Sequence, residues 1–176
     1  TFLLSLTFLF LFSGSVYGGE PEVKREYWDN GKLKSETHYM HENGMPVYLQ
    51  IWINREGLDT YWYENGKKSG EIRYKNGKQE GRQIWWYENG QKNFELNSKD
   101  DKLEGRSISW YENGQKRNES HHKNGKREGL ETEWYRNGKK KYTKHFKNGK
   151  DNGIRKEWSE DGKKTFQGNF VNGNEE

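Results

Sequence analysis

The sequence predicts an all-β protein: an elongated antiparallel meander of tandem β-hairpin repeats, each 24 residues long. One observation is an Asn-Gly or Asp-Gly pair that returns every 24 residues from Asn65 to Asp161. Another is that a Trp stands three residues before each pair and a Gly stands eight residues before it. The third is a second turn signal inside each unit, which leaves about eight to ten residues per strand and no room for helices.

The repeating positions form columns that extend through the chain. We call the pairs at the 24-residue step the outer turns, and they begin at Asn65, Asn89, Asn113, Asn137 and Asp161. The tryptophan column is Trp62, Trp86, Trp110, Trp134 and Trp158. The glycine column is Gly57, Gly81, Gly105, Gly129 and Gly153.

Composition restricts how this protein can bury a core. Hydrophobic residues make up only 28% of the chain, aromatic residues make up 15%, and alanine is absent. Low hydrophobicity with 33% charged residues is typical of disordered chains. Regular repetition argues against disorder, because stacked repeats bury a shared core that no single unit could form. The aromatic residues are therefore expected to provide most of the burial.

The N-terminal segment differs from the rest of the chain. Residues 1–18 hold an uncharged run rich in Leu and Phe, followed by small residues, which is typical of a secretory signal peptide. The alternative is an uncleaved membrane anchor, although the apolar run is short for a membrane span. Residues 19–56 are predicted to form an irregular N-terminal cap with a degenerate repeat, and residues 57–176 a regular repeat array. The chain has no Cys, so no disulfide stabilises it.

Each unit of the array also contains an inner turn, formed by Asn-Gly at residues 76, 124, 148 and 172 and by Asp100-Asp101 in one unit. Asn and Gly tolerate positive φ, so we expect two-residue type I′ turns at inner and outer pairs alike. This geometry places Trp86 opposite Asn93, although a one-residue shift in the loop would exchange the faces of a strand. The glycine column is expected to provide room for an aromatic ring from the next strand.

These residues resemble a known family. The units that contain Gly-Lys-Arg-Glu-Gly and Trp-Tyr-Glu-Asn-Gly are similar to the MORN repeat, in particular to the variant of bacterial YwqK-type antitoxin repeat proteins. The resemblance covers five tandem copies between Gly57 and Gly173. It implies a scaffolding or membrane-associated role and, for the bacterial variant, an antitoxin-like function.

No residue pattern indicates catalysis, so we expect a non-enzymatic protein without a cofactor or a metal ion. His121 and His145 occupy equivalent positions, and the interpretation as solvated polar residues is favoured over a weak metal site. A net charge of +4 is small for 176 residues, so nucleic acid is not an expected partner.

The candidate partner surface consists of columns that could meet a ligand or another protein. The tryptophan column is one, and the alternative is that its rings form the core. The tyrosines that follow four of these tryptophans are Tyr63, Tyr87, Tyr111 and Tyr135. The lysine column is Lys68, Lys92, Lys116, Lys140 and Lys164. Its alternative role is structural, because a Lys after the turn can pair with a Glu or cover a neighbouring aromatic ring with its stem.

The predicted function is therefore an exported, periplasmic or secreted scaffold that binds another protein. The alternative is that the aromatic columns recognise a cell-envelope glycan or a lipid head group at a membrane surface, since exposed rings stack on sugars and hold quaternary ammonium groups. The sequence does not indicate an oligomeric state.

Overall fold

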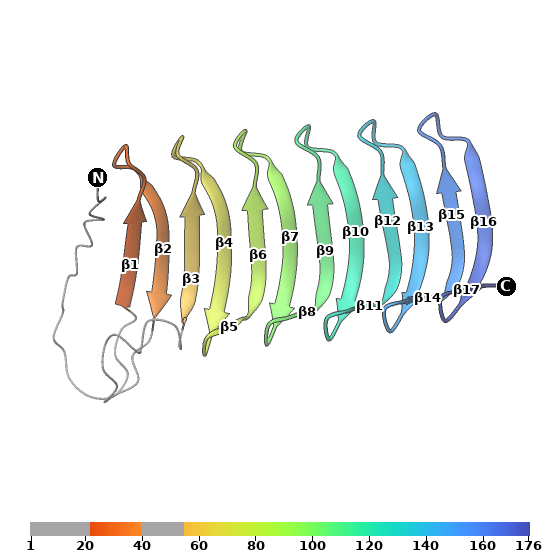
Figure 1. Cartoon of the computed structure of the whole chain (residues 1–176), viewed down its shortest axis with the longest axis horizontal. Coiled ribbons are helices and arrows are strands. Elements are labelled where there is room, and N and C mark those ends of the chain that lie inside the picture. The colour runs from red at the N-terminus through yellow and green to blue at the C-terminus, as the bar shows by residue number, and fades with distance from the viewer. Residues whose placement is uncertain (1–21, 40–54) are drawn as a thin grey trace, which may run out of the picture.

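The computed structural model describes residues 22–39 and 55–176, and the strands in these ranges form one antiparallel sheet (Figure 1). The longer strands are β1 (Glu22–Tyr27), β2 (Leu33–Tyr39), β3 (Gly57–Trp62), β4 (Lys68–Lys75), β6 (Gly81–Trp86), β7 (Lys92–Lys99), β9 (Gly105–Trp110), β10 (Lys116–Lys123), β12 (Gly129–Trp134), β13 (Lys140–Lys147), β15 (Gly153–Trp158) and β16 (Lys164–Val171). Two-residue strands follow the inner turns: β5 (Lys78–Gln79), β8 (Lys102–Leu103), β11 (Lys126–Arg127), β14 (Lys150–Asp151) and β17 (Asn174–Glu175). The described residues contain no helix, which confirms the predicted fold class.

Hairpins stack in chain order along the long axis of the array (Figure 1). Each longer strand between β1 and β16 pairs with the longer strand before it and the one after it, as in β3–β4, β4–β6 and β6–β7. The predicted signal peptide, residues 1–18, lies outside the described residues, as do residues 19–21 and 40–54 of the predicted cap. Within the described ranges, no helix is long and apolar enough to cross a membrane.

The outer turns are three-residue loops. At the first regular one, the Gly66 N–H donates to the Tyr63 carbonyl at 2.9 Å, and the Tyr63 N–H donates to the Lys67 carbonyl at 2.8 Å. Gly66 has a φ of 88°, whereas Asn65 does not have a positive φ. This is a type I turn followed by a left-handed Gly, which forms a bulge. The prediction of a two-residue type I′ loop at the outer turns is wrong.

The longer loop changes the predicted pairing only next to the turn. Trp86 pairs with Lys92 and not with Asn93 as predicted, and a bulge then restores the predicted register from the Trp85–Phe94 pair onward. The Asn89 side chain provides the reason, because its Oδ1 accepts the Gln91 N–H at 2.9 Å. This local bond from an Asn side chain to the backbone two residues on competes with the type I′ conformation.

The inner turns have the predicted conformation. Asn76 has a φ of 50° and Gly77 a φ of 74°, which is the type I′ pattern. Asp100 and Asp101 adopt the same turn, with φ values of 49° and 63°.

The glycine column has a different role from the one predicted. A side chain at Gly105 or Gly129 would meet no atom within 4 Å, so no aromatic ring covers these positions. Gly81 has a φ of 85°, and its equivalents are also left-handed, so the column forms bulges that bend the strand. Close ring packing occurs instead at Gly70, where a Cβ would lie 2.5 Å from the Trp85 ring.

The bend folds each hairpin toward one face of the sheet, which we call the concave face. Gln83 Nε2 donates to Gln79 Oε1 at 2.9 Å, although residues four apart in a straight strand would be about 13 Å apart. The opposite, convex face holds the tryptophan column. Most buried side chains lie on the concave face: Asp59, Ile72, Tyr74, Gln83, Ser98, Ser109, Ser120, Glu131, Phe146 and Phe170.

The first hairpin stacks on the array as the regular units do, although it lies outside the 24-residue step. The indole of Trp28 donates to the Trp62 carbonyl at 3.3 Å, and in the next unit the Tyr63 hydroxyl donates to the Trp86 carbonyl at 2.6 Å. The β1–β2 hairpin, which was predicted to be part of an irregular cap, therefore contacts the following unit in the same way as a regular repeat does.

Candidate partner surfaces

The tyrosine column joins neighbouring repeats. Each hydroxyl donates to the backbone carbonyl of the Trp in the following unit, at 2.6 to 2.8 Å, and the rings are half-buried in the outer turns. These bonds are made by Tyr63, Tyr87, Tyr111 and Tyr135. The predicted partner residues of this column thus contribute to the stacking of the repeats.

The tryptophan column lies half-buried on the convex face. Its rings are thus neither a fully buried core nor a fully exposed ligand surface, the two roles expected for them. Lysines from the preceding unit cover two of its rings: Lys92 Nζ lies 5.5 Å from the Trp110 ring centroid, and Lys116 Nζ lies 5.7 Å from that of Trp134. An ammonium group over an indole face adds a cation–π attraction. The covered rings leave less open surface for a ligand than a bare aromatic platform would.

Three members of the lysine column, Lys68, Lys92 and Lys116, pair with a Glu, which is the structural alternative expected for this column. Glu95 accepts hydrogen bonds from Arg82 at 2.8 Å and Lys92 at 2.7 Å. Arg106 and Lys116 hold Glu119 in the same way. Lys68 pairs with Glu71, and Lys164 donates to Gln167. Lys140 has no such partner among the described residues.

A pH-dependent effect is expected from this arrangement. The Arg106 hydrogen bond, helped by Lys116, lowers the pKa of Glu119 from 4.5 to about 2. A lowered pKa stabilises the folded state above pH 4.5, and this contribution is lost as the pH falls toward 2. We expect Glu119→Gln to reduce the free energy of unfolding at pH 7 by about 1 kcal/mol, because Arg106 and Lys116 are half-exposed and water screens the pairs.

Urea unfolding of the wild type and Glu119→Gln at pH 7 and at pH 2 would measure this effect. At pH 2 the difference should shrink. An equal difference at both pH values would contradict the assignment to the charged carboxylate.

The concave face holds an aromatic row that the sequence interpretation missed. The Tyr61 and Trp85 rings stack, with centroids 5.8 Å apart, and Trp85 pairs with Phe94 on the next strand. Phe94 is 41% exposed. Beyond Phe94 the row continues with two small polar residues, Ser109 and Asn118. An exposed aromatic edge therefore adjoins a stretch without large side chains.

A charged cluster follows this row toward the C-terminus. Glu131 is 2% exposed, its Oε1 accepts the Tyr142 hydroxyl at 2.5 Å, and its Oε2 lies 3.1 Å from Arg127 Nε. Burial and the Glu131 hydrogen bond raise the pKa of Tyr142. Burial lowers the pKa of the neighbouring His122, so its imidazole tends to be neutral.

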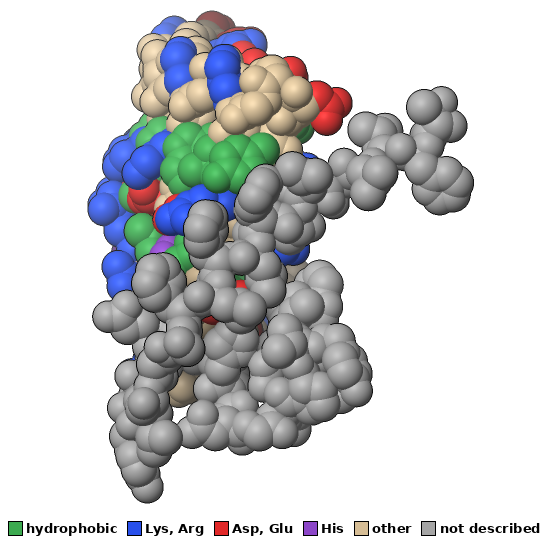
Figure 2. All heavy atoms as spheres, turned by 90° about the vertical axis from the view of Figure 1, so that its left-hand side faces the viewer, with side chains coloured by type: hydrophobic (Ala, Val, Ile, Leu, Met, Phe, Trp, Pro, Cys, Tyr) green, Lys and Arg blue, Asp and Glu red, His purple; other side chains and the backbone are tan. Residues whose placement is uncertain are grey.

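Charged side chains are distributed unevenly over the surface. Seen from the end at which β1 lies, Lys and Arg side chains follow one another down one side of the array (Figure 2). In the ranges 22–39 and 55–176, no group of three or more His, Asp or Glu residues is arranged to hold a metal ion.

Comparison with known families gives one finding. The family model of the MORN repeat variant matches six tandem segments: residues 23–41, 55–76, 79–100, 103–124, 127–148 and 151–172. The first of these segments covers the β1–β2 hairpin apart from Glu22. No curated protein gives a significant match.

Proposed function

The chain belongs to the MORN repeat variant family, and we propose that it is a non-enzymatic scaffold that binds another protein along its concave face. The observation that carries this proposal is the row Tyr61, Trp85 and Phe94, which ends in an aromatic side chain that is 41% exposed. Exposed aromatic residues are enriched at protein interfaces, where they act as anchors.

The dimensions of the array support a protein partner. The longer strands, spaced about 4.8 Å apart, make a face roughly 55 Å long. A specific interface needs about 800 Å² on each partner, and a face of this length can provide it. Export to the periplasm or the medium is part of the proposal. The antitoxin role implied by the family resemblance is one form of this proposed protein-binding function, in which the bound protein is a toxin.

Substitutions taken from the next repeat provide a test that introduces only residues already present at these positions of the array. Trp85→Ser with Phe94→Asn gives the third hairpin the residues that Ser109 and Asn118 have in the fourth. Ile154 on the convex face, 47% exposed, can be changed to Arg, the residue at the equivalent Arg106. We expect a protein captured from envelope extract by the wild type to be retained by Ile154→Arg and lost by the double variant.

Two results would contradict the proposal. One is equal capture by the wild type and the double variant. The other is binding of purified envelope glycan or of liposomes by the wild type, with no captured protein and with loss of that binding in the double variant. The second result would favour the alternative function, in which the aromatic row stacks on sugar rings.

A further inference from the structure

Four of the five inner turns place two lysines directly opposite each other. The cross-strand pairs are Lys75 with Lys78, Lys99 with Lys102, Lys123 with Lys126, and Lys147 with Lys150. Like charges in directly opposite positions destabilise a sheet. The pairs recur in successive hairpins about 10 Å apart, and so form a line about 30 Å long. We call this line the lysine edge.

Most lysines of the lysine edge have no carboxylate partner among the described residues. Among the described residues, the only ion pair of the lysine edge joins Lys78 to Asp100, at 3.3 Å. The glutamates beside the turns are directed elsewhere: Glu104 accepts the Asn124 N–H at 2.8 Å, and Glu128 accepts the Asn148 N–H at 2.9 Å. The ammonium groups are therefore available to an external anion.

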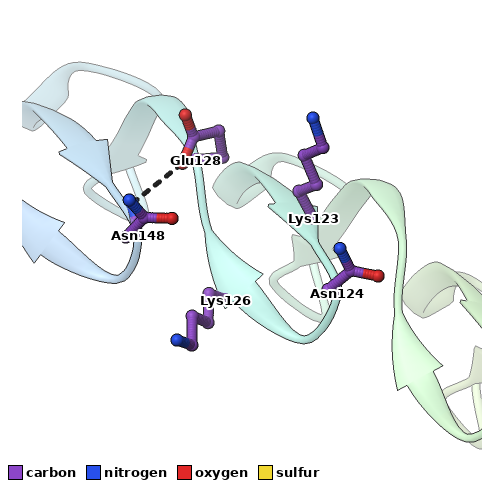
Figure 3. Close-up of a pocket in the computed structure, with 5 residues that line it drawn as sticks. All are labelled: Lys123, Asn124, Lys126, Glu128 and Asn148. Carbon is purple, nitrogen blue, oxygen red and sulfur yellow. Dashed lines mark hydrogen bonds between the residues drawn. The ribbon is translucent and has the colours of Figure 1, made fainter.

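A cavity of about 250 Å³ lies between two neighbouring inner turns. Its lining consists of Lys123, Asn124, Lys126, Glu128 and Asn148, and Figure 3 shows Glu128 directed to the Asn148 backbone. Ammonium and side-chain amide groups are the donors that a tetrahedral oxyanion needs, although Figure 3 shows Lys123 and Lys126 directed away from each other. The Glu128 carboxylate opposes an anion, which limits the affinity of any single cavity and favours a ligand that spans several turns.

We propose that the lysine edge binds a linear phosphate polymer, with successive phosphate groups in contact with successive lysine pairs. A line of charge fits a linear polyanion better than a membrane plane, and among the described residues no exposed large apolar side chain lies in the four turns of the lysine edge. The aromatic residues that precede two of the turns, Tyr74 and Phe146, are buried on the concave face and cannot stack on nucleic acid bases. This site is separate from the proposed protein-binding row.

Binding to long-chain inorganic polyphosphate over a series of salt concentrations tests the proposal. One variant changes Lys123, Lys126, Lys147 and Lys150 to Gln. The matched control changes Lys68, Lys92, Lys116 and Lys140 to Gln, which removes the same charge at the outer turns. We expect the edge variant to bind at least tenfold more weakly at 0.1 M salt, with a salt slope lower by roughly 3. An equal loss in the control would overturn the proposal, because net charge alone would then explain it.

A gain-of-function variant distinguishes the site from a folding effect. Asp100→Asn with Asp101→Gly converts Lys-Asp-Asp-Lys into the Lys-Asn-Gly-Lys of the turns at residues 123 and 147. Gly tolerates the φ of 63° at position 101, so the turn should be retained. We expect this variant to bind polyphosphate several-fold more tightly than the wild type. Unchanged affinity would overturn the proposal, as would tighter binding to single-stranded DNA or to anionic vesicles than to polyphosphate.

Discussion

Replacing Trp110 by Ala should lower the free energy of unfolding by about 3 kcal/mol. Loss of a fully buried Trp costs about 3 to 5 kcal/mol, and Trp110 is half-buried on the convex face, so the lower end applies. The substitution also removes the ring that the Lys92 ammonium covers at 5.5 Å. The hydrogen bond from Tyr87 to the Trp110 carbonyl, 2.8 Å long, involves the backbone and can persist. Urea denaturation followed by circular dichroism would measure the change.

Phe94→Ala is the matched control for Trp110→Ala. Phe94 is 41% exposed on the concave face, so its truncation should cost less than about 1 kcal/mol. The two variants should also differ in partner capture, which should weaken for Phe94→Ala and persist for folded Trp110→Ala. A cost below 1 kcal/mol for Trp110→Ala, together with lost ligand binding, would mean that the tryptophan column is a ligand surface.

Repetition and turn chemistry were sufficient to predict the fold class. A 24-residue step leaves no space for helices, and Asn-Gly pairs mark hairpins because their backbones accept positive φ. The inner turn at Asn76 has the predicted conformation for this reason.

The length of the outer loops, and the pairing of the residues beside them, could not be derived in the same way. An Asn-Gly pair fits both a two-residue type I′ loop and a three-residue loop that ends in a left-handed Gly. At Asn89 the outcome depends on its side-chain bond to the Gln91 N–H, and at the glycine column on a bulge. Both features depend on local backbone conformation and on hydrogen bonds to it, which the spacing of residues in the sequence does not determine.

The aromatic row on the concave face was not predicted, because the candidate residues were chosen from positions that are the same in every repeat. Recurring residues such as Tyr87 hold one repeat to the next, whereas the aromatic row on the concave face is formed where a repeat departs from the pattern. Trp85 and Phe94 have Ser109 and Asn118 at the equivalent positions of the next unit. In a repeat protein such departures indicate where a partner could be recognised, once the register is known.

Glu131→Ala should lower the free energy of unfolding by about 3 kcal/mol. Glu131 is 2% exposed, and its carboxylate holds the Tyr142 hydroxyl at 2.5 Å and Arg127 at 3.1 Å. Removal of one partner from a buried ion pair typically costs about 3 to 5 kcal/mol. Arg127 is half-exposed and can turn toward water, so the lower end is expected. Chemical denaturation at pH 7 would measure the loss.

Glu131→Gln tests whether the charge or the shape of this side chain matters. The Gln carbonyl can accept a hydrogen bond from either Arg127 or Tyr142, but its amide donates and would face the other donor. We therefore expect a loss of about 1 to 2 kcal/mol. Ultraviolet titration should also show a lower pKa for Tyr142, since Glu131 helps to raise it, although burial still holds it above its usual range. Glu133→Gln, which removes a partly exposed pair with Lys141, should cost under about 1 kcal/mol and lower the pKa of Tyr142 less than Glu131→Gln does. An unchanged Tyr142 titration in Glu131→Gln would show that the carboxylate does not control this cluster.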